Sequence, residues 1–148
     1  MRAVIQRVVA ARVRVGDRSA GAIGPGLLAL VGIAVEDKEE DGDWLLDKML
    51  DLRIFENAAG KFDRSLREVG GALMVVSQFT LLADTRRGRR PSFTAAAPPG
   101  HAIPLYERIV ERARTAGVSV ATGEFGAHMQ VELVNDGPVT IILDSKAR

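Results

Sequence analysis

The longest apolar segment of the chain, from Leu27 to Val35, limits what the chain can fold into. It has nine residues, whereas a helix that crosses a membrane needs about 20. Short uninterrupted runs of this kind are typical of strands that are buried on both faces. The segment therefore predicts a buried strand in a globular domain, and no contact with a membrane is expected.

A tight turn is predicted directly before this strand, at Gly24-Pro25-Gly26. Proline fixes its own φ and glycine accepts a positive φ, so the three residues favour a reversal of the chain. A hairpin that leads into residues 27–34 is therefore expected. A phosphate-binding glycine loop is a poorer interpretation, because no Lys-Ser/Thr pair follows and the next element is a strand rather than a helix.

Apolar and polar residues alternate well enough over residues 3–15 to predict two short strands. Their arginines should face outwards, and the side chains expected to face inwards are Val4, Val8, Val13 and Val15. Further strands are predicted at 73–76, 118–121, 129–134 and 139–143, with a short extended piece at 54–55. The last two long strands should be separated by a turn at residues 135–138.

Two segments have the three- and four-residue apolar spacing of amphipathic helices. The first covers residues 41–53 and should place Trp44 in the core. The second covers residues 102–116, with Pro104 in its first turn, where the missing N–H costs little, and Gly117 as its stop. The arginine- and proline-rich residues 83–100 lie between them and predict one long functional loop.

Taken together, these elements predict an α/β chain with one domain over residues 1–148. The expected architecture is a strand-rich mixed fold, with a curved, largely antiparallel β layer and two main helices packed on it. A chain of 148 residues can bury a stable core without disulfides or metals.

Composition excludes several kinds of chemistry. The absence of cysteine removes disulfides, thiolate nucleophiles and cysteine-bound zinc, and it favours a cytoplasmic protein. The first residues also lack the apolar core of a signal peptide. Only His101 and His128 could ligate a metal through imidazole, and their spacing does not match a metal motif, so neither a metal nor another cofactor is expected.

Familiar hydrolytic machinery is not visible in the sequence. No Gly-x-Ser-x-Gly elbow is present, which disfavours a Ser-His-Asp hydrolase. Asp84 and Asp136 could form a pair of catalytic acids, but both stand in turn-like sequence, where aspartate commonly binds the local backbone. The net charge is only +1, so binding of nucleic acid would depend on local clusters of arginine.

Two motifs are more specific than generic core sequence. Ser77-Gln78-Phe79-Thr80-Leu81-Leu82 places hydrogen-bonding side chains at the end of a buried strand, and Asn135-Asp136-Gly137-Pro138-Val139-Thr140 contains a Gly-Pro step. Both resemble the signature motifs of the D-aminoacyl-tRNA deacylase family. Other landmarks follow in the family's order: Ile5-Gln6-Arg7-Val8, Arg53-Ile54-Phe55, Arg90-Pro91-Ser92-Phe93 and Met129-Gln130-Val131.

The resemblance implies that the chain hydrolyses the ester between a D-amino acid, or glycine, and the terminal adenosine of tRNA. The catalytic residues that it implies are Ser77, Gln78, Phe79 and Thr80. Backbone amides of this segment would polarise the ester carbonyl, and a 2′-hydroxyl of the RNA would assist proton transfer. Thr80 as a nucleophile is the alternative, although an unaided threonine hydroxyl is a weak one.

The resemblance also implies a homodimer in which a cis Gly137-Pro138 bond enters the site of the other subunit. There its carbonyl oxygens would exclude an L side chain. Arg7 would hold the orientation of this motif, and Met129 and Asn135 would lie at the substrate. His128 departs from the family, where an acidic residue is expected.

The arginine cluster of the long loop gains a role from the same resemblance, because tRNA binding needs contacts to phosphate. Its proposed tRNA-binding residues are Arg86, Arg87, Arg89 and Arg90. Two rival functions stay open at this point. One is a tRNA-binding module that keeps the fold without turnover, and the other is an esterase for small substrates.

Overall fold

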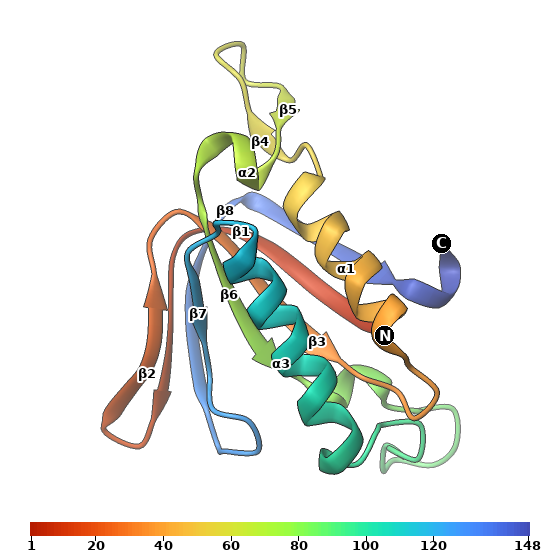
Figure 1. Cartoon of the computed structure of the whole chain (residues 1–148). Coiled ribbons are helices and arrows are strands. Elements are labelled where there is room, and N and C mark those ends of the chain that lie inside the picture. Colours follow the sequence, from red (N-terminus) through yellow and green to blue (C-terminus); the bar gives the residue numbers. More distant parts are fainter.

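The computed structural model describes residues 1–148, and its main feature is a curved sheet of six strands (Figure 1). The strands are β1 (Arg2–Val15), β2 (Arg18–Ile23), β3 (Gly26–Gly32), β6 (Ala72–Ser77), β7 (Val120–Thr122) and β8 (Gln130–Asp144). Their order is β2-β1-β3-β6-β7, with β8 paired to the other edge of β1. The predicted strand-rich mixed fold is confirmed.

The long strand β1 organises the sheet. Strand β8 runs antiparallel along it from the Arg2↔Asp144 pair to the Arg14↔Gln130 pair. Strands β3 and β2 occupy the opposite edge of β1, also antiparallel. Beyond β3, the β6 and β7 pairings are parallel. The prediction of an antiparallel layer therefore holds for the strands that pair with β1, whereas the pairings of β3 with β6 and of β6 with β7 are parallel.

The sheet curls until its two ends nearly meet. A Cβ added to Gly21 on β2 would lie 2.5 Å from the carbonyl oxygen of Thr122 on β7. Only a residue without a side chain fits such an approach. Six buried residues fill the inside of this curl: Val8, Ala11, Val13, Leu28, Met74 and Val76.

Three predictions about the strands were wrong for the same reason. At each place the residue pattern predicted an interruption or a reversal of the chain that the structure does not have. Residues 2–15 form one strand rather than two, and β8 runs through the expected turn at 135–138. Gly24-Pro25 does not reverse the chain either. Ile23 pairs with Ala11 and Gly26 with Val8, so β2 and β3 run in the same direction along β1. Pairing to a continuous neighbour strand therefore overrides local turn signals.

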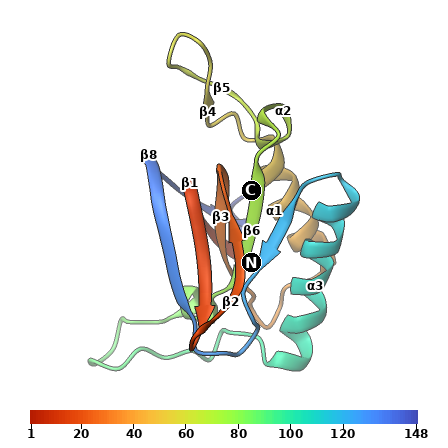
Figure 2. The ribbon, with the colours of Figure 1, turned by 90° about the vertical axis from the view of Figure 1, so that its left-hand side faces the viewer.

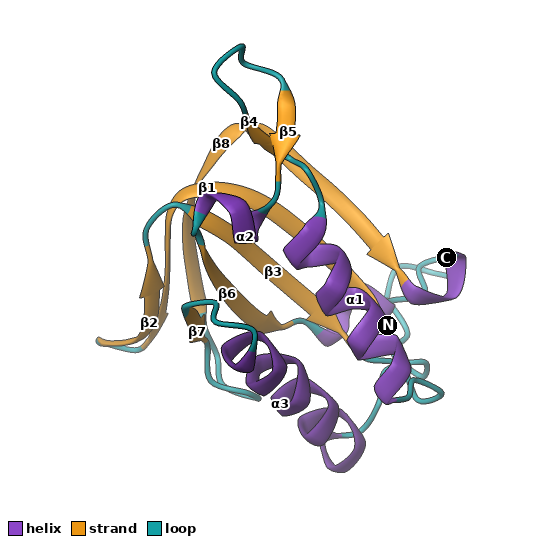
Figure 3. Ribbon diagram, turned by 45° about the horizontal axis from the view of Figure 1, so that its top comes forward, coloured by secondary structure: helices purple, strands orange, loops and turns teal.

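Helices α1 (Glu39–Asp51) and α3 (Pro99–Thr115) cover one face of the sheet, as Figures 2 and 3 show. A cluster of 23 buried residues lies between them and the strands, including Ala3 and Ile5 of β1. Val4 points to the opposite face and is only partly buried, contrary to the prediction. Trp44 packs against the core from a partly exposed position rather than within it.

The start of α3 differs from the prediction. The helix begins at Pro99 after Pro98, which is its N-cap, so Pro104 stands inside the helix at its sixth position. The prolines at the true start occupy the positions where a missing N–H costs little, which is the role that was predicted for Pro104. The earlier start brings His101 into the first turn of the helix.

The remaining elements are short. A small hairpin of β4 (Phe55–Glu56) and β5 (Phe62–Arg64) projects beyond the sheet, and α2 (Leu66–Val69) leads from it into β6. The 3-10 turns are η1 (Phe79–Leu82), directly after β6, and η2 (Ser145–Ala147), near the C-terminus. None of the helices has both the length and the apolar character needed to cross a membrane.

Candidate active site

A cavity of about 560 Å³ opens where β6 ends. It lies between the η1 turn, the start of α3 and the loop that leads into β8. Sixteen residues line it: Ile33, Val76, Ser77, Gln78, Phe79, Phe93, Ala96, Ala97, Pro99, Ala102, Phe125, Gly126, Ala127, His128, Met129 and Val131. Four of the sequence-predicted site residues are therefore brought together here, namely Ser77, Gln78, Phe79 and Met129.

The sheet itself positions the first wall. Strand β6 is held between β3 and β7, and its last ladder position pairs Ser77 with Val31. The Gln78 N–H then donates to the Val31 carbonyl at 2.8 Å, and the chain turns into η1. The Phe79 ring meets the Phe93 ring edge-on, with 5.1 Å between the centroids. This wall is thus fixed by backbone bonds at its base and an aromatic pair at its rim.

Thr80 stands beside this wall but does not line the cavity. Its hydroxyl accepts a hydrogen bond from the Gln78 side-chain amide. No histidine or carboxylate contacts the Thr80 hydroxyl, so no general base is in place to activate it. The N–H groups of Phe79 and Thr80 precede the first internal hydrogen bond of η1, which runs from Leu81 N–H to the Gln78 carbonyl at 3.2 Å.

The opposite wall is the loop of residues 123–129. Met129 is seated there, and its sulfur lies 3.4 Å from the Glu124 amide nitrogen. Gly123 leaves room for this sulfur, because a Cβ at that position would lie 2.5 Å from it and the Met129 side chain would have to move. His128 is the one titratable side chain that lines the cavity. No group of three or more His, Cys, Asp or Glu side chains is arranged to hold a metal ion.

Sequence reasoning missed several residues of the cavity, among them Phe93, Phe125 and Pro99. Phe93 and Phe125 interrupt loops that are otherwise rich in small or polar residues. An aromatic residue in such a loop is a usable signal, because it must bury its ring somewhere or present it to a ligand.

Gly137 and Pro138 are not among the residues that line the cavity. Their peptide bond is cis, as the resemblance implied. The motif forms a bulge in β8, where the register against β1 jumps from Gln6↔Thr140 to Val8↔Asn135. The Asn135 amide closes the bulge by accepting from Val139 N–H at 2.7 Å and donating to the Val139 carbonyl at 3.1 Å. Asn135 therefore shapes the bulge.

Arg7 is buried, contrary to the prediction that the arginines of this segment face outwards; its exposed fraction is 4%. Its Nε donates to the Asp136 carbonyl at 2.8 Å, and its Nη1 donates to the Ile54 carbonyl at 2.8 Å. A third contact reaches Glu56 at 3.4 Å. A buried guanidinium needs such partners, and these fix the bulge to the chain that enters the β4–β5 hairpin.

Other arginines of the two clusters noted in the sequence differ in their pairing. Arg12, Arg14 and Arg18 of the N-terminal strands form ion pairs with Glu132 or Glu124. In the long loop, Arg86 pairs with Asp84, and the bond to Arg86 lowers the Asp84 pKa. The other three loop arginines, Arg87, Arg89 and Arg90, form no ion pair and no side-chain hydrogen bond with the protein. They are the cations available to a polyanion.

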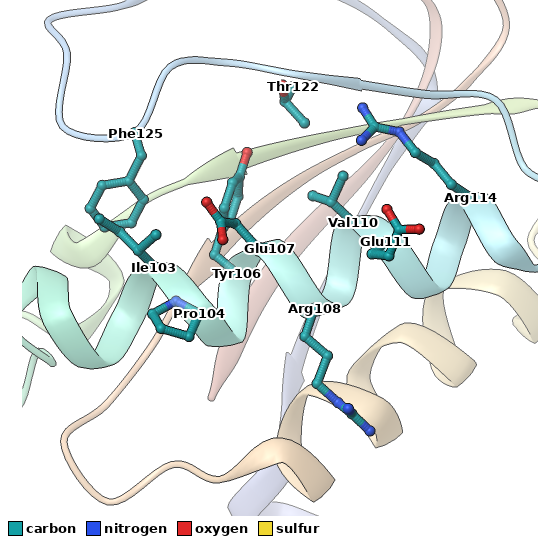
Figure 4. A pocket seen from close by; sticks show the side chains of 10 residues that line it. All are labelled: Ile103, Pro104, Tyr106, Glu107, Arg108, Val110, Glu111, Arg114, Thr122 and Phe125. Atoms are coloured by element: carbon teal, nitrogen blue, oxygen red, sulfur yellow. The ribbon is translucent and has the colours of Figure 1, made fainter.

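A second hollow of about 680 Å³ lies between α3 and the segment that carries Thr122 and Phe125 (Figure 4). Its lining mixes acidic and basic side chains from the helix, including Glu107, Glu111 and Arg114, with Thr122 and Phe125 from the opposite side. None of the sequence-predicted site residues lies in it. The cavity at the end of β6 is therefore the candidate active site.

Comparisons with known proteins show which family the chain resembles over nearly its whole length. The family model described as D-Tyr-tRNA(Tyr) deacylase matches residues 4–144. The chain is 56% identical to the D-aminoacyl-tRNA deacylase of Symbiobacterium thermophilum, over 99% of this chain and 97% of that protein. For the D-aminoacyl-tRNA deacylase of a Roseiflexus species, the identity is 59% over 98% and 94%.

A solved structure described as c-Myc DNA Unwinding Element Binding Protein also has this fold. It superposes with a TM-score of 0.91 and is 39% identical, over 97% of this chain and 98% of that chain. With the family model spanning nearly the whole chain, and close relatives aligned from end to end, the chain belongs to the D-Tyr-tRNA(Tyr) deacylase family.

Proposed function

We propose that the chain hydrolyses the ester between a D-amino acid, or glycine, and the terminal adenosine of tRNA. The observation that carries the proposal is the meeting of Ser77, Gln78, Phe79 and Met129 around one cavity, in a chain that belongs to this deacylase family. The compartment that we propose is the cytoplasm, where charged tRNA is used.

The proposed chemistry depends on positioning and electrostatics. The attacking water converts the ester carbonyl into a tetrahedral oxyanion, and the N–H groups of Phe79 and Thr80 are available to stabilise it. Collapse of the intermediate then expels the ribose oxygen, which takes up the proton that the attacking water gives up. The neighbouring 2′-hydroxyl of the RNA can relay this proton, so the protein need not supply an acid or a base of its own.

Replacing Thr80 by alanine should leave measurable deacylation, within about tenfold of wild type, because an unaided threonine hydroxyl is not the nucleophile. Single-turnover release of D-tyrosine from D-tyrosyl-tRNA checks this. Complete loss of release, with tRNA binding unchanged, would favour the account in which Thr80 attacks the ester.

We further propose that the enzyme is a homodimer in which the Gly137-Pro138 bulge of each subunit completes the cavity of the other. Within one subunit the two lie far apart. Ser77 is level with Ala3 on β1, and the bulge is level with Arg7. Four residues along the strands and three strand spacings give a separation of roughly 20 Å. The bulge is therefore free to enter a neighbour's site.

An uncovered apolar patch on the sheet supports the proposal that a second copy of the chain binds there. Val4 pairs with Leu30 on one side and Ile142 on the other, so these three side chains share the face that carries no helix. The exposed fraction of Ile142 is 75%. An apolar cluster of this kind on a sheet face is typical of a surface that a partner covers.

The rigid main chain of the Gly137-Pro138 bulge would account both for the rejection of L-amino acids and for the acceptance of many different D-amino acids. Carbonyl oxygens placed at the substrate Cα would clash with an L side chain and accept hydrogen bonds from the amino group. The bulge does not contact the end of a D side chain, so many D-amino acids would be accepted, and glycine cannot be rejected on steric grounds. The unpaired loop arginines Arg87, Arg89 and Arg90 would hold the tRNA backbone.

Deacylation of D-tyrosyl-tRNA and L-tyrosyl-tRNA tests the proposed function. We expect release from the D form only. No release from either would indicate a tRNA-binding module without turnover, and equal release would remove chiral selection. Cleavage of a small ester such as D-tyrosine methyl ester with comparable kcat/KM would instead indicate a general esterase.

A further inference from the structure

Phe125 is a wall shared by two spaces. It lines the cavity at the end of β6, and it also lines the second hollow, beside α3. Figure 4 shows Phe125 hanging from the loop before β8 towards α3, near Ile103. The loop that carries Phe125 therefore separates the candidate active site from the second hollow. Because that hollow is open, the Phe125 ring has space to move away from the active site.

The contact that holds this wall from behind is made by Tyr106. The rings of Tyr106 and Phe125 are 5.9 Å apart between centroids and inclined by 60°, a favourable geometry for an aromatic pair. Tyr106 itself is buried, with an exposed fraction of 7%. Its hydroxyl donates to the Val75 carbonyl at 2.8 Å.

The hydroxyl of Tyr106 is a permanent donor. Burial raises the pKa of Tyr106 to about 12, with partial opposition from Arg114 and Thr122. The phenol therefore keeps its proton at physiological pH, and the bond to Val75 does not switch.

Val75 stands two residues before Ser77 on the same buried strand. Tyr106 thus joins both walls of the cavity: its hydroxyl is tied to the strand that delivers Ser77 and Gln78, and its ring supports Phe125 on the opposite side. We infer that Tyr106 is a positioning residue that sets the width of the substrate cavity. Its hydroxyl is anchored to the Val75 carbonyl, and its ring holds Phe125 in place from behind.

This inference rests on the proposed function, because it concerns the width of that same cavity. Without the Tyr106 hydroxyl, the ring pair can shift outwards into the hollow on α3. The wall would then contact the acceptor end of the tRNA less closely. The ester itself lies at the opposite wall, so its reaction should be little affected. Loss of a contact made equally in the ground state and the transition state raises KM and leaves kcat unchanged.

Tyr106→Phe tests this directly, since it removes only the hydroxyl and keeps the aromatic ring. For D-tyrosyl-tRNA we expect KM to rise by about three- to tenfold, with kcat within about twofold of wild type. Ile109→Val is the matched control, because Ile109 is buried on the same helix but lines neither space. That control should lower the melting temperature and leave KM unchanged.

A second measurement isolates the coupling to Phe125. Phe125→Leu should raise KM as well, and adding Tyr106→Phe to it should produce little further rise, because both changes release the same wall. Independent, multiplying effects on KM would overturn the inference, and so would an unchanged KM for Tyr106→Phe in an active enzyme. If the wild-type protein releases no D-tyrosine, the proposed function fails instead, so the two failures are distinguishable.

Discussion

Arg7→Ala is expected to lower kcat/KM for D-aminoacyl-tRNA by about 100-fold while the protein stays folded. The guanidinium donates to the Asp136 carbonyl, directly before Gly137, and to the Ile54 carbonyl. Without it, the Gly-Pro bulge loses the bonds that fix its orientation. A displacement of about 1 Å in a positioning group can cost roughly 100-fold in rate. The discrimination between D- and L-tyrosyl-tRNA should narrow in the same variant.

Arg12→Ala is the matched control for this change. Arg12 stands on the same strand, but its side chain is exposed and pairs with Glu132 on the surface. Loss of such a pair costs little, so kcat/KM should stay within about twofold of wild type. Arg7→Lys should resemble Arg7→Ala rather than wild type, because one ammonium cannot replace the guanidinium fork. Full activity of Arg7→Ala with retained D-selectivity would contradict the role assigned to the bulge.

The largest loss of stability is expected from Asp37→Ala. The Asp37 carboxylate is fully buried and lies 2.6 Å from the Met1 α-ammonium, and its second oxygen accepts from Ala34 N–H at 2.7 Å. Removing it leaves the buried ammonium with only the Ser145 hydroxyl as an acceptor, and it leaves the buried Ala34 N–H with none. Breaking a buried ion pair from one side costs about 3–5 kcal/mol. Urea unfolding should show this difference in the free energy of unfolding.

The surface aspartate Asp47 supplies the comparison on helix α1. Its side chain is 58% exposed and stands 3.9 Å from Arg112. Asp47→Ala should lower the free energy of unfolding by less than about 1 kcal/mol, as is usual for exposed pairs. Equal stability of the two variants would contradict the view that the buried network of Met1, Asp37 and Ser145 makes a large contribution to the free energy of unfolding.

The sequence predicted the elements of the fold better than their continuity. Apolar spacing and short apolar runs located both main helices and the strands β1, β3, β6 and β8, because a buried face or a fully buried strand leaves a recognisable pattern of apolar residues. Strand β2 (Arg18–Ile23) has no such pattern and was not predicted. It could not show that β8 continues through Asn135 to Thr140, since a bulge and a turn use the same residues and only pairing with β1 separates them. The burial of Arg7 was hidden for a related reason: its acceptors are carbonyls from residues 54 and 136.

The candidate site was predictable in part. The pattern of residues marked a strand end with hydrogen-bonding side chains at 77–80, and the resemblance to the deacylase motifs assigned that strand end to the site. The opposite wall was mostly missed, because Phe125 contacts the cavity only after the loop before β8 folds back over α3. The separation of Gly137-Pro138 from the cavity within one subunit follows from strand register, which the sequence alone does not give.

The shared site is tested most directly by mixing two inactive variants. Gln78→Ala impairs the cavity wall, and Gly137→Ala distorts the bulge, where an added Cβ would lie 2.7 Å from the Val139 nitrogen at a φ of +151°. In a mixed dimer with exchanged bulges, one site carries both defects and the other carries none. Statistical mixing should therefore restore roughly one quarter of wild-type deacylation. If each cavity is completed by its own chain, every site keeps one defect, and the mixture stays as inactive as the separate variants.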